Sequence, residues 1–131
     1  MNQKPSAAVV GASWVAVGAG MLGFLSGLSR ADMQLNEKGF YFAVLMYGLF
    51  SAVSVQKSVR DRLEGIHVTD IYYGLSWFST IVAITLLVIG LWNASILPSE
   101  KGYYAFSFLL ALFGAIAVQK NTRDSGIGEA K

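Results

Sequence analysis

The sequence predicts an all-α, polytopic membrane protein whose four transmembrane helices form two parallel two-helix repeats. Three observations support this fold class. Of the 131 residues, 54% are hydrophobic and 14% are charged, whereas about a quarter of a soluble domain is charged. The apolar residues gather in four runs, at residues 7–28, 39–55, 71–92 and 102–118. The second half of the chain also repeats the polar phrases of the first half.

Each apolar run is long enough to cross a bilayer as a helix. A hydrocarbon core about 30 Å thick needs roughly 20 helical residues, and runs 7–28 and 71–92 have 22 residues each. The other two runs have 17 residues each, and Lys57 and Lys120 just beyond them can extend toward the headgroups. The runs are continuous rather than alternating, which is typical of transmembrane helices and not of barrel strands.

The chain matches itself without a gap when it is shifted by 63 residues. Trp14 then falls on Trp77, the "EKG" at 37–39 falls on that at 100–102, and "VQKSVRD" at 55–61 falls on "VQKNTRD" at 118–124. Apolar composition alone would not align these polar phrases. We therefore expect two-helix repeats at residues 6–64 and 69–127. Two helices return the chain to its starting side, so the repeats should be related by a pseudo-two-fold axis along the membrane normal.

Lysine and arginine are unevenly shared between the two sides of the predicted bundle. The richer side holds seven of them: Lys4, Lys57, Arg60, Arg62, Lys120, Arg123 and Lys131. The other side holds Arg30, Lys38 and Lys101. Cytoplasmic loops carry the excess of positive charge, so both termini are expected in the cytoplasm.

The repeated phrase places a candidate polar cluster at the cytoplasmic side. Its members are Gln56, Lys57, Arg60, Asp61, Gln119, Lys120, Arg123 and Asp124. One interpretation is a snorkelling helix end with a Lys57–Asp61 pair one turn apart. A second is a clamp between the repeats, in which Arg60 meets Asp124 and Arg123 meets Asp61. A third is a site for a partner protein or a lipid headgroup.

The external side carries a second set of repeated residues, Glu37, Lys38, Glu100 and Lys101. Asn36 and Ser99 are expected to cap the helices that begin here, with each glutamate at the positive end of the helix dipole. The alternative is a headgroup site formed by the two lysines with Tyr41 and Tyr104. We expect an aromatic belt on this side from Phe40, Tyr41, Trp92, Tyr103 and Tyr104, and one on the inner side from Tyr72 and Tyr73.

Inside the membrane, two features are candidates for helix packing. Trp14 and Trp77 lie deeper than belt positions and are expected to pack within the bundle, with ligand stacking as the alternative. Gly23 and Gly27 form a GxxxG motif, which allows close helix approach within the chain or between chains.

Four stretches resemble the YiaA/YiaB family of small bacterial inner-membrane proteins, which is built on a two-helix domain. They are "MQLNEKGFYFAVL", "GLFSAVSVQKSVRD", "LWNASILPSEKGYY" and "LFGAIAVQKNTRD". The resemblance runs from about the first apolar run to Asp124. It implies that the protein is located in the bacterial inner (plasma) membrane. The family is functionally uncharacterised, so the resemblance implies no activity and supplies no catalytic residues.

The residues that usually carry chemistry are scarce. None of the four runs contains Asp, Glu, Lys, Arg or His, cysteine is absent, and His67 is the single histidine. We therefore predict no catalytic, cofactor or metal site. The net charge of +2 is too small to indicate nucleic-acid binding. The expected function is a non-enzymatic structural or interaction protein whose partners are membrane lipids and either a second copy or another membrane protein.

Two rival classes remain. A small transporter or channel subunit would need a polar path, for which the candidates are Ser13, Ser76, Ser79, Thr80 and Thr85. Ion-coupled transporters usually place acidic, basic or histidine side chains at mid-membrane depth, and the four runs contain none of these. An enzyme would have to use Asp61, Glu64, His67 and Asp70 on the cytoplasmic side, and is the weakest candidate.

Overall fold

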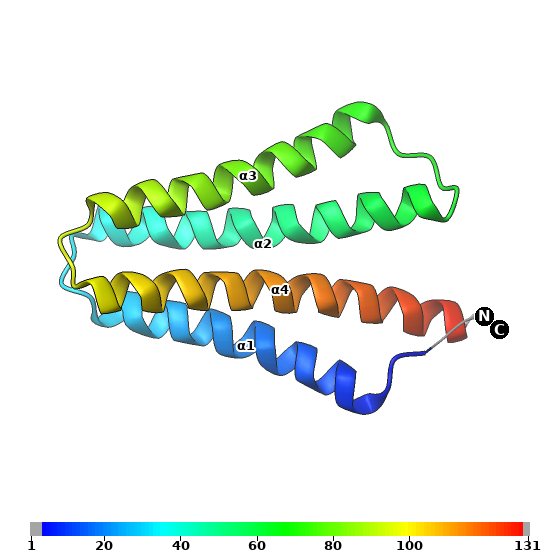
Figure 1. Cartoon of the computed structure of the whole chain (residues 1–131), viewed down its shortest axis with the longest axis horizontal. Coiled ribbons are helices and arrows are strands. Elements are labelled where there is room, and N and C mark those ends of the chain that lie inside the picture. Colours follow the sequence, from blue (N-terminus) through cyan, green and yellow to red (C-terminus); the bar gives the residue numbers. More distant parts are fainter. Residues whose placement is uncertain (1–3, 130–131) are drawn as a thin grey trace.

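The computed structural model describes residues 4–129 as a bundle of four helices (Figure 1). They are α1 (Ala7–Arg30), α2 (Leu35–Leu63), α3 (Asp70–Asn93) and α4 (Pro98–Glu129). All four are long and apolar enough to cross a membrane, and no strand occurs in the described part of the chain. The predicted all-α class with four spans is therefore confirmed. Lys131, which contributes to the charge asymmetry, lies outside the described residues.

The helices begin in the same way in both repeats. Ser6 caps α1 by accepting a hydrogen bond from the Val9 amide, and Thr69 caps α3 by accepting one from the Tyr72 amide. At the starts of α2 and α4, Glu37 and Glu100 each accept a hydrogen bond from a backbone amide three residues earlier, at 3.1 and 3.0 Å. These amides belong to Gln34 and Leu97. The predicted caps Asn36 and Ser99 are therefore wrong. They lie inside the first turn, because each glutamate reaches back and starts the helix earlier.

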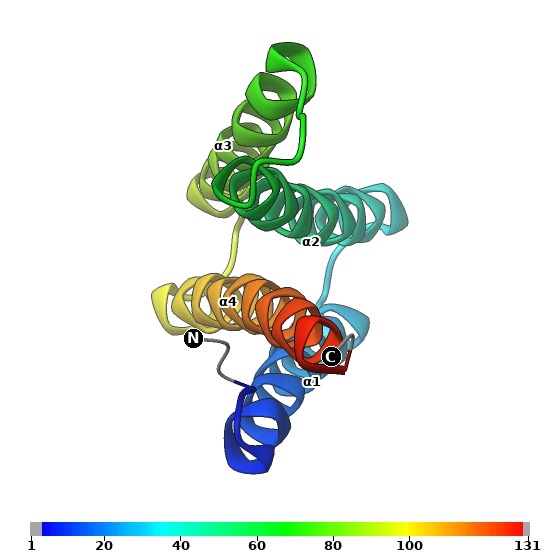
Figure 2. The same ribbon diagram turned by 90° about the vertical axis from the view of Figure 1, so that its right-hand side faces the viewer.

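The first helix of each repeat packs on the second helix of the other repeat. Viewed end-on, the order is α3, α2, α4, α1 (Figure 2). α1 lies along α4 and α3 lies along α2, while α2 and α4 meet in the middle. α1 and α2 are consecutive, yet they barely touch each other. Each sequence repeat is thus an open pair of helices, and the packed units are formed between repeats.

Aromatic side chains fill the centre near one end of the bundle. Tyr41 and Tyr104 are buried where α2 meets α4, and Phe24 meets the Tyr104 ring edge-on at a centroid distance of 5.4 Å. Phe108 and Leu45 are fully buried beside them. The prediction that Tyr41 and Tyr104 belong to an exposed aromatic belt is wrong, because each lies on the helix face turned toward the other repeat. Phe40, Trp92, Tyr103 and Tyr72 are exposed.

Glycines bring α1 and α4 into backbone contact. A Cβ atom at Gly20 would meet the backbone of Ala111 and the Ser107 carbonyl oxygen, and one at Gly114 would meet the backbone of Val17. In the α2–α3 pair, the repeat-equivalent positions of Gly20 and Gly114 are Ala83 and Ser51. α2 and α3 pack together less extensively than α1 and α4, so the two halves of the bundle are related but not identical.

The two intramembrane packing predictions have different outcomes. Trp14 and Trp77 are 58% and 42% exposed, so their predicted packing inside the bundle is wrong. Gly23 and Gly27 do lie in a close helix contact, beside Tyr103, Tyr104 and Ser107 of α4. The Tyr103 hydroxyl donates a 2.6 Å hydrogen bond to the Gly23 carbonyl. The GxxxG motif therefore packs within the chain.

Candidate functional site

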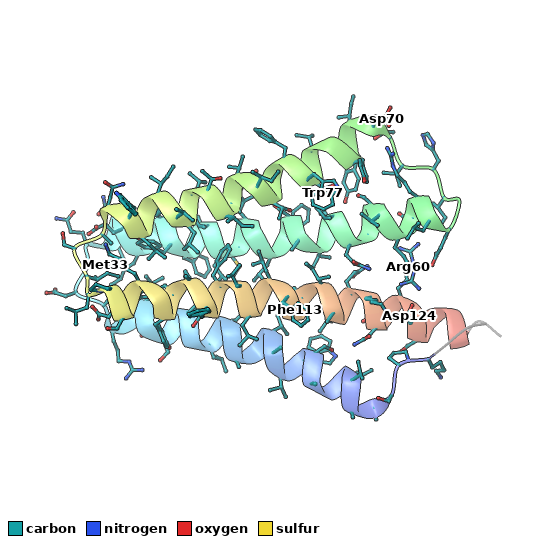
Figure 3. All side chains as sticks on the ribbon, in the orientation of Figure 1. Met33, Arg60, Asp70, Trp77, Phe113 and Asp124 are labelled. Carbon is teal, nitrogen blue, oxygen red and sulfur yellow. The ribbon has the colours of Figure 1, made fainter. Side chains whose placement is uncertain are left out.

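A charged cluster joins α2 and α4 at the end of the bundle where both helices terminate. Arg60 of α2 donates to Asp124 of α4, and Arg123 of α4 donates to Asp61 of α2. In Figure 3 the Arg60 and Asp124 side chains approach each other across the space between the two helices. The two ion pairs are exchanged by the repeat symmetry. The structure therefore brings together the two pairs expected of an inter-repeat clamp.

Each aspartate also has a lysine one helical turn before it. Lys57 lies 2.9 Å from Asp61 and Lys120 lies 2.9 Å from Asp124. Each carboxylate is thus held between a lysine of its own helix and an arginine of the other. The snorkelling pair and the clamp, which are separate interpretations of the sequence, occur together. Gln56 and Gln119 are half-buried beside the cluster and take no part in these ion pairs.

Glu64 breaks the symmetry of the cluster. Its carboxylate accepts hydrogen bonds from Arg60 at 2.6 Å and from Arg123 at 3.0 Å, so it bridges the two arginines. The repeat-equivalent position is Ile127. The hydrogen bond from Arg60, aided by Arg123, holds the pKa of Glu64 below its ordinary value. The sequence repeat does not reveal this role, because repeat analysis draws attention to matched positions and Glu64 has no match.

Asp61 is the most buried carboxylate of the cluster. The Asp61 side chain is 6% exposed, whereas those of Lys57 and Lys120 are more than half exposed. A buried carboxylate without a partner would cost several kcal/mol, so Asp61 requires its cations. Among the described residues, no buried side-chain nitrogen or oxygen lacks a hydrogen-bond partner. The arrangement therefore stabilises a fixed contact between the repeats.

One further polar contact between helices supports this end and was not predicted from the sequence. Asn121 donates a buried 3.1 Å hydrogen bond to the Ser13 hydroxyl, which ties α4 to α1. Its repeat equivalent is Ser58, which donates instead to the Ser54 carbonyl in its own helix. The difference between the two copies of the phrase, asparagine against serine, is the signal that could have indicated it.

The loop after α2 is also held in place. Gly65 has a positive φ of 76°, and the Ile66 amide donates to the Asp61 carbonyl, which ends α2 in a Schellman motif. Arg62 forms a 2.8 Å ion pair with Asp70, and its guanidinium lies 3.9 Å from the centre of the Tyr73 ring. The four residues that an enzyme would have to use at this end of the bundle therefore have different surroundings. Asp61, Glu64 and Asp70 each pair with an arginine, while His67 lies in the α2–α3 loop.

At the opposite end, the repeated lysines tie consecutive helices together. Lys38 donates to the Ser29 carbonyl at 3.3 Å and Lys101 donates to the Trp92 carbonyl at 3.5 Å. These carbonyls belong to the last turns of α1 and α3, where the helix dipole favours a cation. The headgroup site expected from these lysines with Tyr41 and Tyr104 does not form, because both tyrosines are buried in the core.

The hydroxyl groups proposed as a polar path do not form one. Ser13, Ser76 and Thr80 donate to the backbone carbonyls of Val10, Tyr73 and Ser76 within their own helices. Ser13 then faces Asn121 between α1 and α4, whereas Ser76 and Ser79 border α2, and Thr85 is exposed. No group of three potential metal ligands is found in the part of the chain that the structure describes.

Comparison with known proteins identifies a family and two relatives. The sequence model described as "yiaA/B two helix domain" matches twice, at residues 10–61 and 72–124. Inner membrane protein YiaA of Escherichia coli (strain K12) is 57% identical over 119 residues, which cover 91% of this chain and 82% of that protein. Uncharacterized membrane protein YubF of Bacillus subtilis (strain 168) is 44% identical over 52 residues, covering 39% of this chain and 60% of that protein. No solved structure matches.

Proposed function

Because this chain belongs to the YiaA/YiaB family and is a multi-pass inner-membrane protein, we propose that it is a non-enzymatic structural or interaction protein of that membrane. Its partners are membrane lipids together with a second copy or another membrane protein. Both termini lie in the cytoplasm in this proposal.

The main support for the proposal is that the charged side chains of the cluster pair with one another. Arg60, Arg123 and the carboxylates they contact form a closed set of hydrogen bonds between α2 and α4. A catalytic acid or base must be within reach of a substrate proton, whereas these carboxylates are engaged by cations on both sides. Side chains arranged in this way hold two repeats in register and present a fixed cytoplasmic end to a partner.

The cytoplasmic orientation rests on charge. The start of α1, the α2–α3 loop and the end of α4 all lie at the clamp end of the bundle (Figure 1), which is the end rich in lysine and arginine. The positive-inside rule places such an end in the cytoplasm.

A small transporter or channel subunit is the second candidate. Its support is the presence of Ser51, Ser54, Ser76 and Ser79 in a groove between α2 and α3. These residues lie on one side of the bundle, and three of the proposed path residues bond to their own helices. The groove is therefore better suited to an apolar occupant than to the passage of a solute.

Affinity purification tests the proposal. The tagged chain is extracted from its own membrane in mild detergent, and co-purifying proteins are quantified by mass spectrometry. We expect a membrane-protein partner at fixed stoichiometry, or a homo-oligomer, and its loss from a tagged Asp124→Arg variant whose clamp is broken. Purified protein in liposomes should produce no solute or ion flux above that of protein-free vesicles. Reproducible flux would instead support the transporter class.

A further inference from the structure

Two hollows meet on the α2–α3 side of the charged end. The first is an apolar groove of about 220 Å³ whose walls include Tyr47, Phe50, Leu75 and Ser79. The second is a polar hollow of about 290 Å³, lined by Lys57, Asp61, His67, Val68 and Thr69. Tyr72 lines both of them. The two hollows are thus neighbours around one side chain, with the polar one toward the end of the bundle and the apolar one toward its middle.

The groove is open because of the difference between the two repeats. In the α1–α4 pair, Gly114 allows α4 to approach the backbone of Val17. The repeat-equivalent residues in the α2–α3 pair are Ser51 and Thr80, and Ser51 lines the groove. Threonine and valine are similar in size, so the difference lies at Ser51, whose side chain occupies the space that Gly114 leaves free in the other pair.

The depth of the groove suits one leaflet. Lys57, in the polar hollow, is ten residues along α2 from Tyr47, in the apolar groove. Ten helical residues extend about 15 Å, which is half of a hydrocarbon core about 30 Å thick. An acyl chain whose headgroup lies beside Lys57 would therefore follow the groove for the thickness of a leaflet.

The charge of the polar hollow favours an anion. Lys57 contributes one hydrogen bond to Asp61 and keeps a side chain that is 53% exposed. The carboxylate in the hollow, Asp61, is also paired with Arg123 from α4, which in turn contacts Glu64. The cluster sets four cations (Lys57, Arg60, Lys120 and Arg123) against three carboxylates (Asp61, Glu64 and Asp124), so one positive charge is left over. Thr69 lines the same hollow as Lys57. A phosphate group would find a cation and a hydroxyl there.

We propose that the two hollows together bind one anionic phospholipid of the leaflet at the charged end. Its phosphate contacts Lys57 and Thr69, and one acyl chain lies in the groove between α2 and α3. Given the orientation proposed above, this is the cytoplasmic leaflet. The site goes beyond the interaction function and would remain if no protein partner were found.

The repeat provides a matched control. Lys120 is equivalent to Lys57, is also more than half exposed, and makes the same 2.9 Å ion pair one turn along its helix. The hollow at the corresponding end of α1 and α4 is lined instead by uncharged residues that include Trp14, Asn121 and Thr122. Lys57→Gln and Lys120→Gln therefore remove equivalent ion pairs, and only Lys57→Gln alters the proposed lipid site.

Native mass spectrometry of the detergent-purified chain tests the proposal, with added 1-palmitoyl-2-oleoyl phosphatidylglycerol or the corresponding phosphatidylethanolamine. We expect one phosphatidylglycerol to be retained in preference to phosphatidylethanolamine. Lys57→Gln should weaken its binding about fivefold, since a lysine near anionic headgroups contributes about 1 kcal/mol, and Lys120→Gln should leave it unchanged. Ser79→Phe, which fills the groove, should weaken the binding of both lipids.

Three results would overturn the site. Equal retention of the two lipids would mean that only unspecific lipid surrounds the bundle. Equal weakening by Lys57→Gln and Lys120→Gln would assign the effect to the clamp. Unchanged binding in Ser79→Phe would remove the groove from the site. Thermal unfolding of each variant by circular dichroism confirms that the comparison is made between folded proteins.

Discussion

Tyr41 of α2 and Tyr104 of α4 lie nearly parallel between the two repeats, with ring centroids 6.3 Å apart and ring planes 14° from parallel. They are equivalent positions of the repeat, so the pseudo-two-fold axis passes between them. The Arg60–Asp124 and Arg123–Asp61 pairs cross the same axis at the opposite end. The α2–α4 interface is therefore fixed at one end by aromatic packing and at the other by charge.

Reversing one charge of the clamp should destabilise the bundle more than removing it. Asp124→Arg places a cation beside Arg60 and should lower the thermal midpoint in detergent further than Asp124→Ala. Partly exposed ion pairs contribute about 1 kcal/mol or less each. The Arg60→Asp, Asp124→Arg double variant should recover part of the loss, limited by the new repulsion between the introduced carboxylate and Glu64. A double variant no better than the summed single effects would refute the coupling.

Replacing a glycine of α1 by alanine should destabilise the bundle only where that glycine contacts another helix. Gly20→Ala forces a Cβ atom against the backbone of α4 and should cost about 1–3 kcal/mol. Gly18→Ala, two residues earlier, has no atom within 4 Å of the new Cβ and should cost nothing. Chemical or thermal unfolding in detergent measures the difference. Equal effects of the two substitutions would contradict the close α1–α4 approach.

Each repeat should need the other in order to fold. Residues 1–66 and 67–131 expressed separately should be protease-sensitive, because α1 and α2 barely touch each other. Expressed together, the two fragments should co-purify as a resistant complex. Gly20→Ala in the first fragment should weaken this complex, and Gly18→Ala should not. A single fragment that resists protease alone would show that the repeat is an independent unit.

Lowering the pH should remove the contribution of Glu64 to the stability of the folded protein. Its pKa is lowered in the folded state by Arg60 and Arg123, so the carboxylate stabilises the fold above its ordinary pKa. The stabilisation disappears as the pH falls through the lowered value. Wild type should therefore be more stable than Glu64→Gln at neutral pH, with a difference that vanishes in acid. Measuring both thermal midpoints from pH 7 downward checks the sign, and a difference that grows in acid would contradict it.

Reporter fusions can establish the orientation. A fluorescent protein and a periplasm-dependent phosphatase are fused in turn after Asp61 and after Lys131. Both positions should give fluorescence without phosphatase activity, because the lysine-rich end is expected in the cytoplasm. Fusions after Asp32 should give the opposite result and serve as the control. Phosphatase activity at either of the first two positions would refute the proposed topology.

The sequence predicts the spans, whereas the clamp is only one of three interpretations of the repeated phrase. The helices follow from the length of the apolar runs. Repeat symmetry implies that a contact of Arg60 with Asp124 has a mate between Arg123 and Asp61, and it does not require that the contact forms. The positions of Trp14 and Trp77 could not be derived in this way. Lipid is as apolar as a protein core, so a large apolar side chain in a span has no strong preference for the inside. The same limit applies to Tyr41 and Tyr104, whose polar tips suggest an interface but whose rings pack in the core.

The sequence repeat does not determine which helices pack together. A sequence repeat states that two segments are alike, and it is equally compatible with packing inside each repeat or between repeats. The glycines of α1 provide the best available signal, because Gly20, Gly23 and Gly27 mark a face made for a close neighbour. They do not indicate which helix that neighbour is.

The interleaved order of the helices has a consequence for biogenesis. α2 and α3 are consecutive and pack together, so they can pair as soon as both have entered the membrane. α1 is synthesised first, yet its neighbour α4 is synthesised last. The newly inserted α1 must therefore wait in the bilayer with its glycine face covered only by lipid. A ribosome stalled before α4 would leave a nascent chain in which α1 has no helix to pack against.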